Sequence, residues 1–225
     1  MSQLALHFNQ SSNFRSEDYL VSSCNQEAHA WIIRWQDWPQ RMLSLYGPTA
    51  SGKTHLSHLW AGLSQAIFLD ADHLGTAPSD TLLGNASACV LERTGMVQNE
   101  EALFHLLNHV KAQGIYLLLN SIDPLPRVSF CLPDLKSRLS SIASVGLKEP
   151  DDEALFAVLF KHFSDRQLRV STEVIRYIIN HTERSFRSAH EWVERIDCSA
   201  LSRKKPVSLS LVRELIRESY NPPLT

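Results

Sequence analysis

The stretch GPTASGKT, residues 47–54, carries the residue types that bind a chain of phosphates. It fits the pattern G-x-x-x-x-G-K-[ST], in which backbone N–H groups curl around a phosphate, a lysine adds positive charge and a hydroxyl binds Mg²⁺. Here Lys53 would contact the β and γ oxygens, and Thr54 would hold the ion. We therefore predict a site for ATP or ADP with Mg²⁺. Its residues are Gly47, Pro48, Thr49, Ala50, Ser51, Gly52, Lys53 and Thr54.

Such a loop must lie between a strand and a helix, and the sequence predicts both. RMLSLYG, residues 41–47, has the apolar run of a buried strand, and KTHLSHLWAGLS, residues 53–64, reads as a helix. Further strands are predicted at residues 66–70, 88–92 and 115–120, and a helix at residues 99–114. Short apolar strands that alternate with helices predict a parallel sheet covered on both faces.

Three polar residues end predicted strands. In open sheets of this kind, ligands bind beyond the carboxyl ends of the strands, so Asp70, Glu92 and Asn120 are candidates for one rim. Glu92 could hold Mg²⁺ through water. Many ATP-hydrolysing proteins with this loop carry a second acid next, but Arg93 stands there, and its guanidinium stays protonated. We expect slow or negligible hydrolysis by this chain alone, with Arg93 either at a phosphate or in solvent.

From about residue 150 the pattern changes to four helical segments without a strand among them. Two of these segments open with Asp-Asp or Ser-Thr, which are helix start signals. The expected fold class is therefore α/β: a P-loop parallel-sheet domain followed by a small all-α domain. The predicted divisions are a tail at residues 1–12, a nucleotide-binding domain at 13–148 and a helical domain at 149–225.

Composition excludes several classes of function. The 225 residues have a net charge of −2, which gives no broad electrostatic footprint for nucleic acid, so direct sequence-specific DNA binding is not expected. No apolar run reaches the roughly 18 residues of a membrane span, and no signal peptide is evident, so we expect a cytoplasmic protein without a membrane partner. The four cysteines lie far apart, which argues against a zinc site or a disulfide framework.

Taken together, GPTASGKTHL, the strand ending at Glu92, LLLNSIDPLP, LPDLKSRL, KHFSDRQLRV and ERSFRSAHEWVERID resemble the AAA+ core of the replication initiator DnaA. The chain looks still more like the Hda (HdaA) family of short DnaA-related proteins, which lack the DNA-binding C-terminal domain of DnaA. The resemblance runs from about residue 13 to the end. It implies an AAA+ P-loop domain followed by a helical lid.

The resemblance also implies residue roles. Asn120 falls at sensor I, a polar residue that reads the γ-phosphate or the attacking water, and Arg187 falls at sensor II, where the lid reaches the nucleotide. Arg138 falls at the arginine finger, which acts in trans; without the resemblance it would read as a surface arginine near a helix end. The segment that borders the adenine would be lined or braced by Tyr19, Leu20, Val21 and Asn25.

The tail carries a separate motif. QLALHF, residues 3–8, fits Q-x-x-L-x-F, by which replication proteins dock on the bacterial sliding clamp, the β subunit of DNA polymerase III, and members of the Hda family carry such a motif. A few apolar anchors dominate affinity in this mode of binding. The alternative is a short strand that packs on the first domain. The clamp-binding residues would be Gln3, Leu4, Leu6 and Phe8.

The resemblance implies a regulator that binds the clamp and promotes hydrolysis of DnaA-bound ATP, which represses the initiation of DNA replication. The bound ADP or ATP would then orient the lid and the interface. One alternative is a helicase loader similar to DnaC, acting on single-stranded DNA or on a helicase. Another is a small P-loop kinase. The sequence leaves the oligomeric state open, a homodimer included.

Overall fold

The computed structural model describes residues 19–203 and 205–220. A parallel five-stranded sheet organises the first part of the chain, with the strand order β2-β3-β4-β1-β5. Its strands are β1 (Met42–Tyr46), β2 (Ile67–Asp70), β3 (Ala88–Glu92), β4 (Tyr116–Ser121) and β5 (Ala143–Gly146). The phosphate loop follows β1, whose neighbours are β4 and β5.

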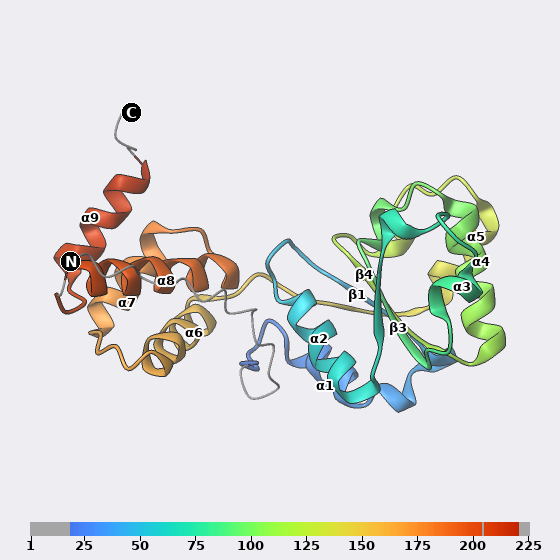
Figure 1. Ribbon diagram of the computed structural model, residues 1–225, viewed down its shortest axis with the longest axis horizontal. Helices are drawn as coiled ribbons and strands as arrows, with labels where there is room; N and C mark the ends of the chain where they lie inside the picture. Colours follow the sequence, from blue (N-terminus) through green and yellow to red (C-terminus); the bar gives the residue numbers. More distant parts are fainter. Residues whose placement is uncertain (1–18, 204, 221–225) are drawn as a thin grey trace, which may run out of the picture.

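Helices cover both faces of the sheet because the buried strands are apolar along most of their length, and successive side chains point to opposite faces. On one face, Leu43 and Val90 pack in the same core as helices α1 (Gln26–Ile33) and α2 (Lys53–Ser64). On the other face, Cys89 and Leu117 share a core with α4 and α5. The helices of that second face are α3 (Ser79–Leu83), α4 (Glu100–Gln113) and α5 (Pro133–Ser141). We call this layered part of the chain, from α1 to β5, the base of the protein. Figure 1 shows it on the right.

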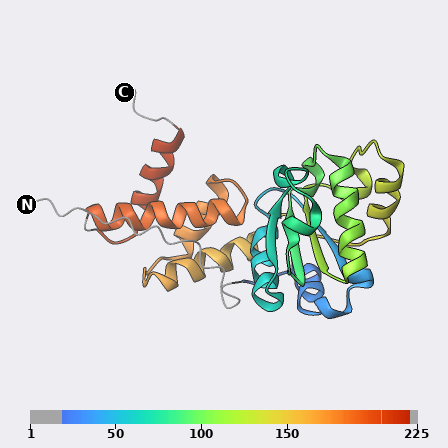
Figure 2. The same cartoon turned by 45° about the vertical axis from the view of Figure 1, so that its right-hand side comes forward.

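The last part of the chain is a helical lid with its own core. Its helices are α6 (Asp152–Asp165), α7 (Thr172–His181), α8 (Phe186–Arg203) and α9 (Leu209–Tyr220). They gather to one side of the base in both ribbon views (Figures 1 and 2). Two of the predicted start signals act as caps: Asp151 Oδ1 accepts from the N–H of Ala154 at 2.8 Å, and Ser171 Oγ accepts from the N–H of Val174 at 3.4 Å.

The structure confirms the expected fold class, a P-loop parallel sheet followed by an all-α lid. The strand at residues 88–92 and the helix at residues 53–64 have the predicted bounds. Sequence reasoning missed β5, the edge strand that pairs with β1. Only four residues long, β5 lies at an edge and includes Ser144 and Gly146, so it lacks the apolar run that marks a buried strand.

The base and the lid are joined by hydrogen bonds as well as by the chain. Ser23 Oγ donates to Asp151 Oδ2 of the lid at 2.7 Å. Just before the lid begins, the N–H of Lys148 donates to the carbonyl of Cys24 at 3.0 Å. Asp151 thus caps α6 and also contacts the segment before α1. The pKa of Asp151 is lowered by the hydrogen bonds that its carboxylate accepts, first from the N–H of Ala154 and then from Ser23.

Candidate functional site

The phosphate loop closes tightly because two glycines make its backbone path possible. Gly52 precedes α2 with a φ of +99°, a conformation that side-chain-bearing residues rarely adopt. A Cβ on Gly47 would lie 2.7 Å from the carbonyl oxygen of Leu147, so that position also excludes a side chain. The loop therefore presents backbone N–H groups at the N-terminus of α2, which is a favourable place for an anion.

Lys53 lies inside this loop. Its Nζ donates to the carbonyls of Gly47 and Pro48, each at 2.6 Å. Partial burial lowers the pKa of Lys53, while the nearby Glu92 carboxylate opposes that shift. The hydroxyl of Ser51 is buried and has no hydrogen-bond partner among the residues that the structure describes. A lysine, backbone N–H groups and an unpaired hydroxyl are the donors that a polyphosphate needs, so these residues fit a nucleotide.

The rim expected at the strand ends is present. Asp70 and Glu92 are paired in register on β2 and β3. Asn120, at the end of β4, donates from Nδ2 to Glu92 Oε1 at 2.9 Å and to Ser57 Oγ of α2 at 2.6 Å. Burial raises the pKa of Glu92, and the hydrogen bond from Asn120 acts in the opposite direction. Glu92 lies near enough to Lys53 for the two charges to interact. Asp70 bonds Arg93 instead.

Arg93 is the partner that engages Asp70. Its Nε donates to Asp70 Oδ2 at 2.9 Å, and its terminal nitrogen pairs with both Asp70 and Asp72. The residue has a left-handed φ of +56°, and its side chain is 45% exposed. The hydrogen bond from Arg93 holds the pKa of Asp70 below its usual range. The sequence offered a phosphate or solvent as the surroundings of Arg93; in the structure its guanidinium is half exposed and paired with two carboxylates.

The segment before α1 packs beside the loop, where a ring carbon of Tyr19 lies 3.9 Å from the position of a Cβ on Gly52. The role of this segment at the adenine stays a prediction. The Tyr19 ring stacks on His29 at 5.7 Å and meets His55 edge-on at 5.1 Å, between ring centres. Asn25 Nδ2 donates to the carbonyl of Leu20 at 2.9 Å, so it braces this segment. Val21 is exposed.

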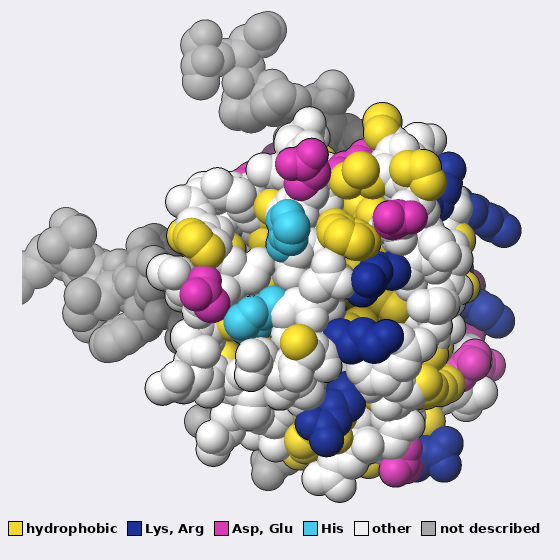
Figure 3. Space-filling model, turned by 90° about the vertical axis from the view of Figure 1, so that its right-hand side faces the viewer, with side chains coloured by type: hydrophobic (Ala, Val, Ile, Leu, Met, Phe, Trp, Pro, Cys, Tyr) yellow, Lys and Arg dark blue, Asp and Glu magenta, His cyan; other side chains and the backbone are white. Residues whose placement is uncertain are grey.

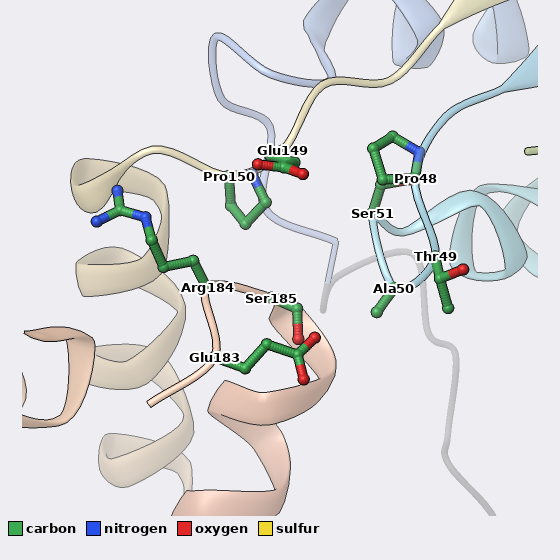
Figure 4. Close-up of a pocket in the computed structure, with 9 residues that line it drawn as sticks. All are labelled: Pro48, Thr49, Ala50, Ser51, Glu149, Pro150, Glu183, Arg184 and Ser185. Carbon is green, nitrogen blue, oxygen red and sulfur yellow. The ribbon is translucent and has the colours of Figure 1, made fainter. Parts of the chain in front are cut away.

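A cavity of about 300 Å³ separates the phosphate loop from the lid. Figure 4 shows the carboxylate of Glu183 directed toward the loop, whereas Arg184 points away from it and pairs with Asp152. Sequence reasoning missed the lid residues of this cavity, because a turn between two helices carries no motif. The lining residues are Pro48, Thr49, Ala50, Ser51, Glu149, Pro150, Glu183, Arg184 and Ser185.

Arg187, the expected sensor II residue, does not line that cavity. It lies in the first turn of α8, where its side chain is 74% exposed and its Nε pairs with Glu191 Oε1 at 2.7 Å. Phe186 approaches the loop instead: one of its ring carbons lies 3.8 Å from the position of a Cβ on Gly52. The role of Arg187 at the nucleotide stays a prediction.

Arg138 lies on α5, across the sheet from α2 and Lys53. Its guanidinium carbon is 4.7 Å from the centre of the Phe104 ring, a cation–π contact with α4. Figure 3 shows this end of the base, where Lys and Arg side chains form a broken line with apolar side chains between them and histidines nearby. The structure therefore places Arg138 apart from the other predicted site residues.

The structure does not test the predicted clamp-binding motif or the predicted Mg²⁺ ligands. Gln3, Leu4, Leu6 and Phe8 of the predicted clamp-binding motif lie outside the described residues. Within residues 19–203 and 205–220, no group of three or more His, Cys, Asp or Glu side chains could hold a metal ion. Thr54, the expected Mg²⁺ ligand, is exposed at the start of α2. A search of the same residues finds no helix that could span a membrane.

Comparison with known proteins agrees with this architecture. The model of the Hda lid domain matches residues 151–216. An uncharacterized protein of Haemophilus influenzae is 28% identical over 192 residues, which cover 80% of this chain and 83% of that protein. The chromosomal replication initiator protein DnaA of Thermomicrobium roseum is 25% identical over 233 residues, which cover 90% of this chain and 49% of DnaA. The chain thus spans about half the length of this DnaA relative.

Solved structures show the same fold. Domain III of DnaA from Thermotoga maritima superposes with a TM-score of 0.78 at 16% identity, covering 94% of this chain and 98% of that one. AMPPCP-bound DnaA from Aquifex aeolicus gives a TM-score of 0.74 at 16% identity, covering 91% of this chain and 69% of that one. Identities this low establish the fold alone. The sequence relatives and the lid match support a DnaA-related AAA+ protein, whose residues 151–216 match the Hda lid domain.

Proposed function

We propose that this protein is a nucleotide-binding regulator that docks on the DNA polymerase sliding clamp and promotes hydrolysis of ATP bound to DnaA. Replication initiation would then be repressed once a clamp is loaded on DNA. The proposal combines a nucleotide site, a clamp-binding tail and an arginine that acts on a partner, and each has its own support.

Support for the nucleotide comes from the donors of the loop and from relatives. Lys53, the backbone N–H groups and Ser51 would hold the phosphates of ADP or ATP. Thr54 would bind Mg²⁺ directly and Glu92 through water, so that the ion neutralises phosphate charge. DnaA from Aquifex aeolicus, a protein of similar fold, binds the ATP analogue AMPPCP.

One observation carries the proposal that chemistry occurs in the partner: Arg138 lies on α5, across the sheet from Lys53. This placement supports a role in trans, because α5 and the phosphate loop belong to different sides of the base. Arg138 would reach the γ-phosphate in the partner and stabilise the charge that spreads over its oxygens as the bond to ADP breaks. Arginine fingers supplied in this way contribute about 10³ to 10⁵ in rate.

The other side of the same proposal is weak hydrolysis by this chain itself. Arg93 stands where a water-activating acid would be expected, and its ion pair with Asp70 and Asp72 keeps it positively charged. The bound nucleotide would then act as a structural and regulatory ligand.

The proposal that this protein docks on the clamp rests on residues 3–8 alone. Leu6 and Phe8 would insert into an apolar pocket of the clamp while Gln3 hydrogen-bonds beside it. The test is a pull-down with purified clamp, in which Phe8→Ala should abolish binding and leave ADP binding unchanged. Retained clamp binding in this variant would contradict the docking assignment.

The regulatory step is tested by phosphate release from ATP-loaded DnaA in the presence of clamp on DNA. Arg138→Ala should keep nucleotide and clamp binding but lose the stimulated rate, whereas Arg127→Ala, which removes another exposed arginine, should retain it. Stimulation by the Arg138 variant equal to the parent would remove the finger assignment. Brisk turnover by this chain alone, with salt-sensitive binding to single-stranded DNA, would instead favour the DnaC-like alternative.

A further inference from the structure

Asn120 makes two hydrogen bonds with a single atom. Its Nδ2 donates to Ser57 Oγ at 2.6 Å and to Glu92 Oε1 at 2.9 Å, and the residue is 1% exposed. An amide nitrogen carries two hydrogens, so both are used by partners within the protein. Asn120 therefore has no hydrogen left to donate to a ligand.

The orientation of this amide is fixed by both partners. The hydroxyl of Ser57 donates its one hydrogen to the carbonyl of Lys53 at 3.1 Å, so toward Asn120 it can only accept. The ionised carboxylate of Glu92 also only accepts. An amide turned the other way would place Oδ1 against two acceptors, so the hydrogen-bond network itself assigns Nδ2 to this side.

The opposite end of the amide is an acceptor and cannot bond a phosphate oxygen. Asn120 Oδ1 is buried and has no hydrogen-bond partner within the described part of the chain. Phosphate oxygens accept hydrogen bonds, so a residue that reads the γ-phosphate directly must donate one. Asn120 could do so only by giving up Ser57 or Glu92, and an unpaired group at a buried position is costly.

We propose that Asn120 is a positioning residue that fixes the carboxylate of Glu92, rather than a sensor of the γ-phosphate. Together the three side chains form the Ser57–Asn120–Glu92 link. Ser57 bonds the carbonyl of Lys53 one turn earlier in α2, so the link ties the Glu92 carboxylate to the helix that carries the phosphate-binding lysine. With Mg²⁺ bound, the positioned Glu92 carboxylate would accept hydrogen bonds from waters of the ion, and the link would serve a diphosphate and a triphosphate alike.

This inference rests on the proposed nucleotide site, and affinity measurements on the full chain test it without any assay of hydrolysis. The probes are fluorescent ADP and fluorescent ATP, each titrated in Mg²⁺ and in EDTA. Ser57→Ala breaks the link at a residue that belongs to no predicted ligand contact, and Asn120→Ala removes its centre. Ser64→Ala is the matched control, since Ser64 Oγ also donates to the carbonyl four residues earlier in α2, at 2.8 Å, but does not bond Asn120.

We expect Ser57→Ala to reduce the Mg²⁺-dependent gain in affinity by roughly 3- to 10-fold, as expected for one lost hydrogen bond, for ADP and ATP equally. Asn120→Ala should reduce it at least as much, with the ratio of ATP to ADP affinity unchanged. Thermal unfolding of each variant checks that it is folded. If Asn120→Ala does not fold, Ser57→Ala alone still tests the inference.

If the parent binds nucleotide, two results would overturn this inference and leave the proposed nucleotide site standing. One is a Ser57→Ala variant that matches Ser64→Ala in its Mg²⁺ dependence. The other is a loss of ATP affinity in Asn120→Ala with ADP affinity intact, which would mark a γ-phosphate sensor. A parent chain that bound neither nucleotide would overturn the proposed nucleotide site together with this inference.

Discussion

The guanidinium of Arg138 on α5 lies over the ring of Phe104 on α4, with 4.7 Å between the guanidinium carbon and the ring centre. The same helix also contacts the segment that leads into α5: the carboxylate of Glu100 accepts from the N–H of Cys131 at 2.7 Å and from that of Leu132 at 2.7 Å. These hydrogen bonds hold the pKa of Glu100 below its usual range. Helix α4 thus contacts both Arg138 and the segment just before α5.

Phe104→Leu should weaken stimulation of ATP hydrolysis in DnaA while leaving nucleotide binding unchanged. The substitution removes the aromatic face but keeps an apolar side chain against the core. A cation–π contact at a partly exposed site is worth about 0.5–1 kcal/mol, so we expect a loss of roughly 2- to 5-fold in the stimulated rate. Phe104→Tyr preserves the face and should restore the rate; equal rates in the leucine and tyrosine variants would argue against a role for the ring.

Lys53→Ala should abolish the rise in melting temperature that ADP with Mg²⁺ produces. Its Nζ, bonded to the carbonyls of Gly47 and Pro48, is the charged donor of the loop. A ligand at 100 times its Kd stabilises a protein by about 2.7 kcal/mol, which differential scanning fluorimetry detects. Lys111→Ala, at an exposed position of α4, is the control and should keep the full shift. An unchanged shift in the Lys53 variant would place the nucleotide elsewhere.

Arg93→Gln should leave the Kd for ADP within about 2-fold of the parent, because the guanidinium is engaged by Asp70 and Asp72. Exposed ion pairs contribute little to stability, so the free energy of unfolding should stay close to that of the parent. Isothermal titration calorimetry and urea unfolding measure the two quantities. A tenfold increase in Kd would show that Arg93 contacts the phosphates after all.

The lid should lose stability in mild acid through His162 of α6. Burial lowers the pKa of His162 to about 4, and the neighbouring charges of His190, Arg166 and Lys161 act in the same direction against Asp165. The unfolded chain takes up this proton near pH 6.5, whereas the folded lid does not until about pH 4. The contribution is therefore complete above pH 6.5 and is lost as the pH falls from there toward 4.

His162→Gln removes that proton site and tests the prediction. Between pH 7 and pH 5, the free energy of unfolding of the parent should fall more steeply than that of the variant, by at most about 1.4 kcal/mol per pH unit. Urea unfolding at several pH values measures both slopes. Parallel slopes would mean that His162 has an ordinary pKa in the folded lid.

Local sequence patterns were enough to predict the phosphate loop and the strand ends that surround it. GPTASGKT lies between a strand and a helix because the apolar run before it and the helical periodicity after it are local signals. Asp70, Glu92 and Asn120 could be placed on one rim because the carboxyl ends of parallel strands share one edge of the sheet. These signals need no knowledge of distant neighbours.

The tertiary structure alone decided which distant side chains meet. Arg93 pairs with Asp70, 23 residues earlier, and Asn120 bonds Ser57 across 63 residues. The cavity likewise joins residues 48–51 to residues 183–185, and β5 is a strand only because β1 offers it an edge. Residue types and their spacing determine local backbone structure. The partner of a polar side chain depends instead on how whole helices and strands pack, and no short segment of sequence determines that packing.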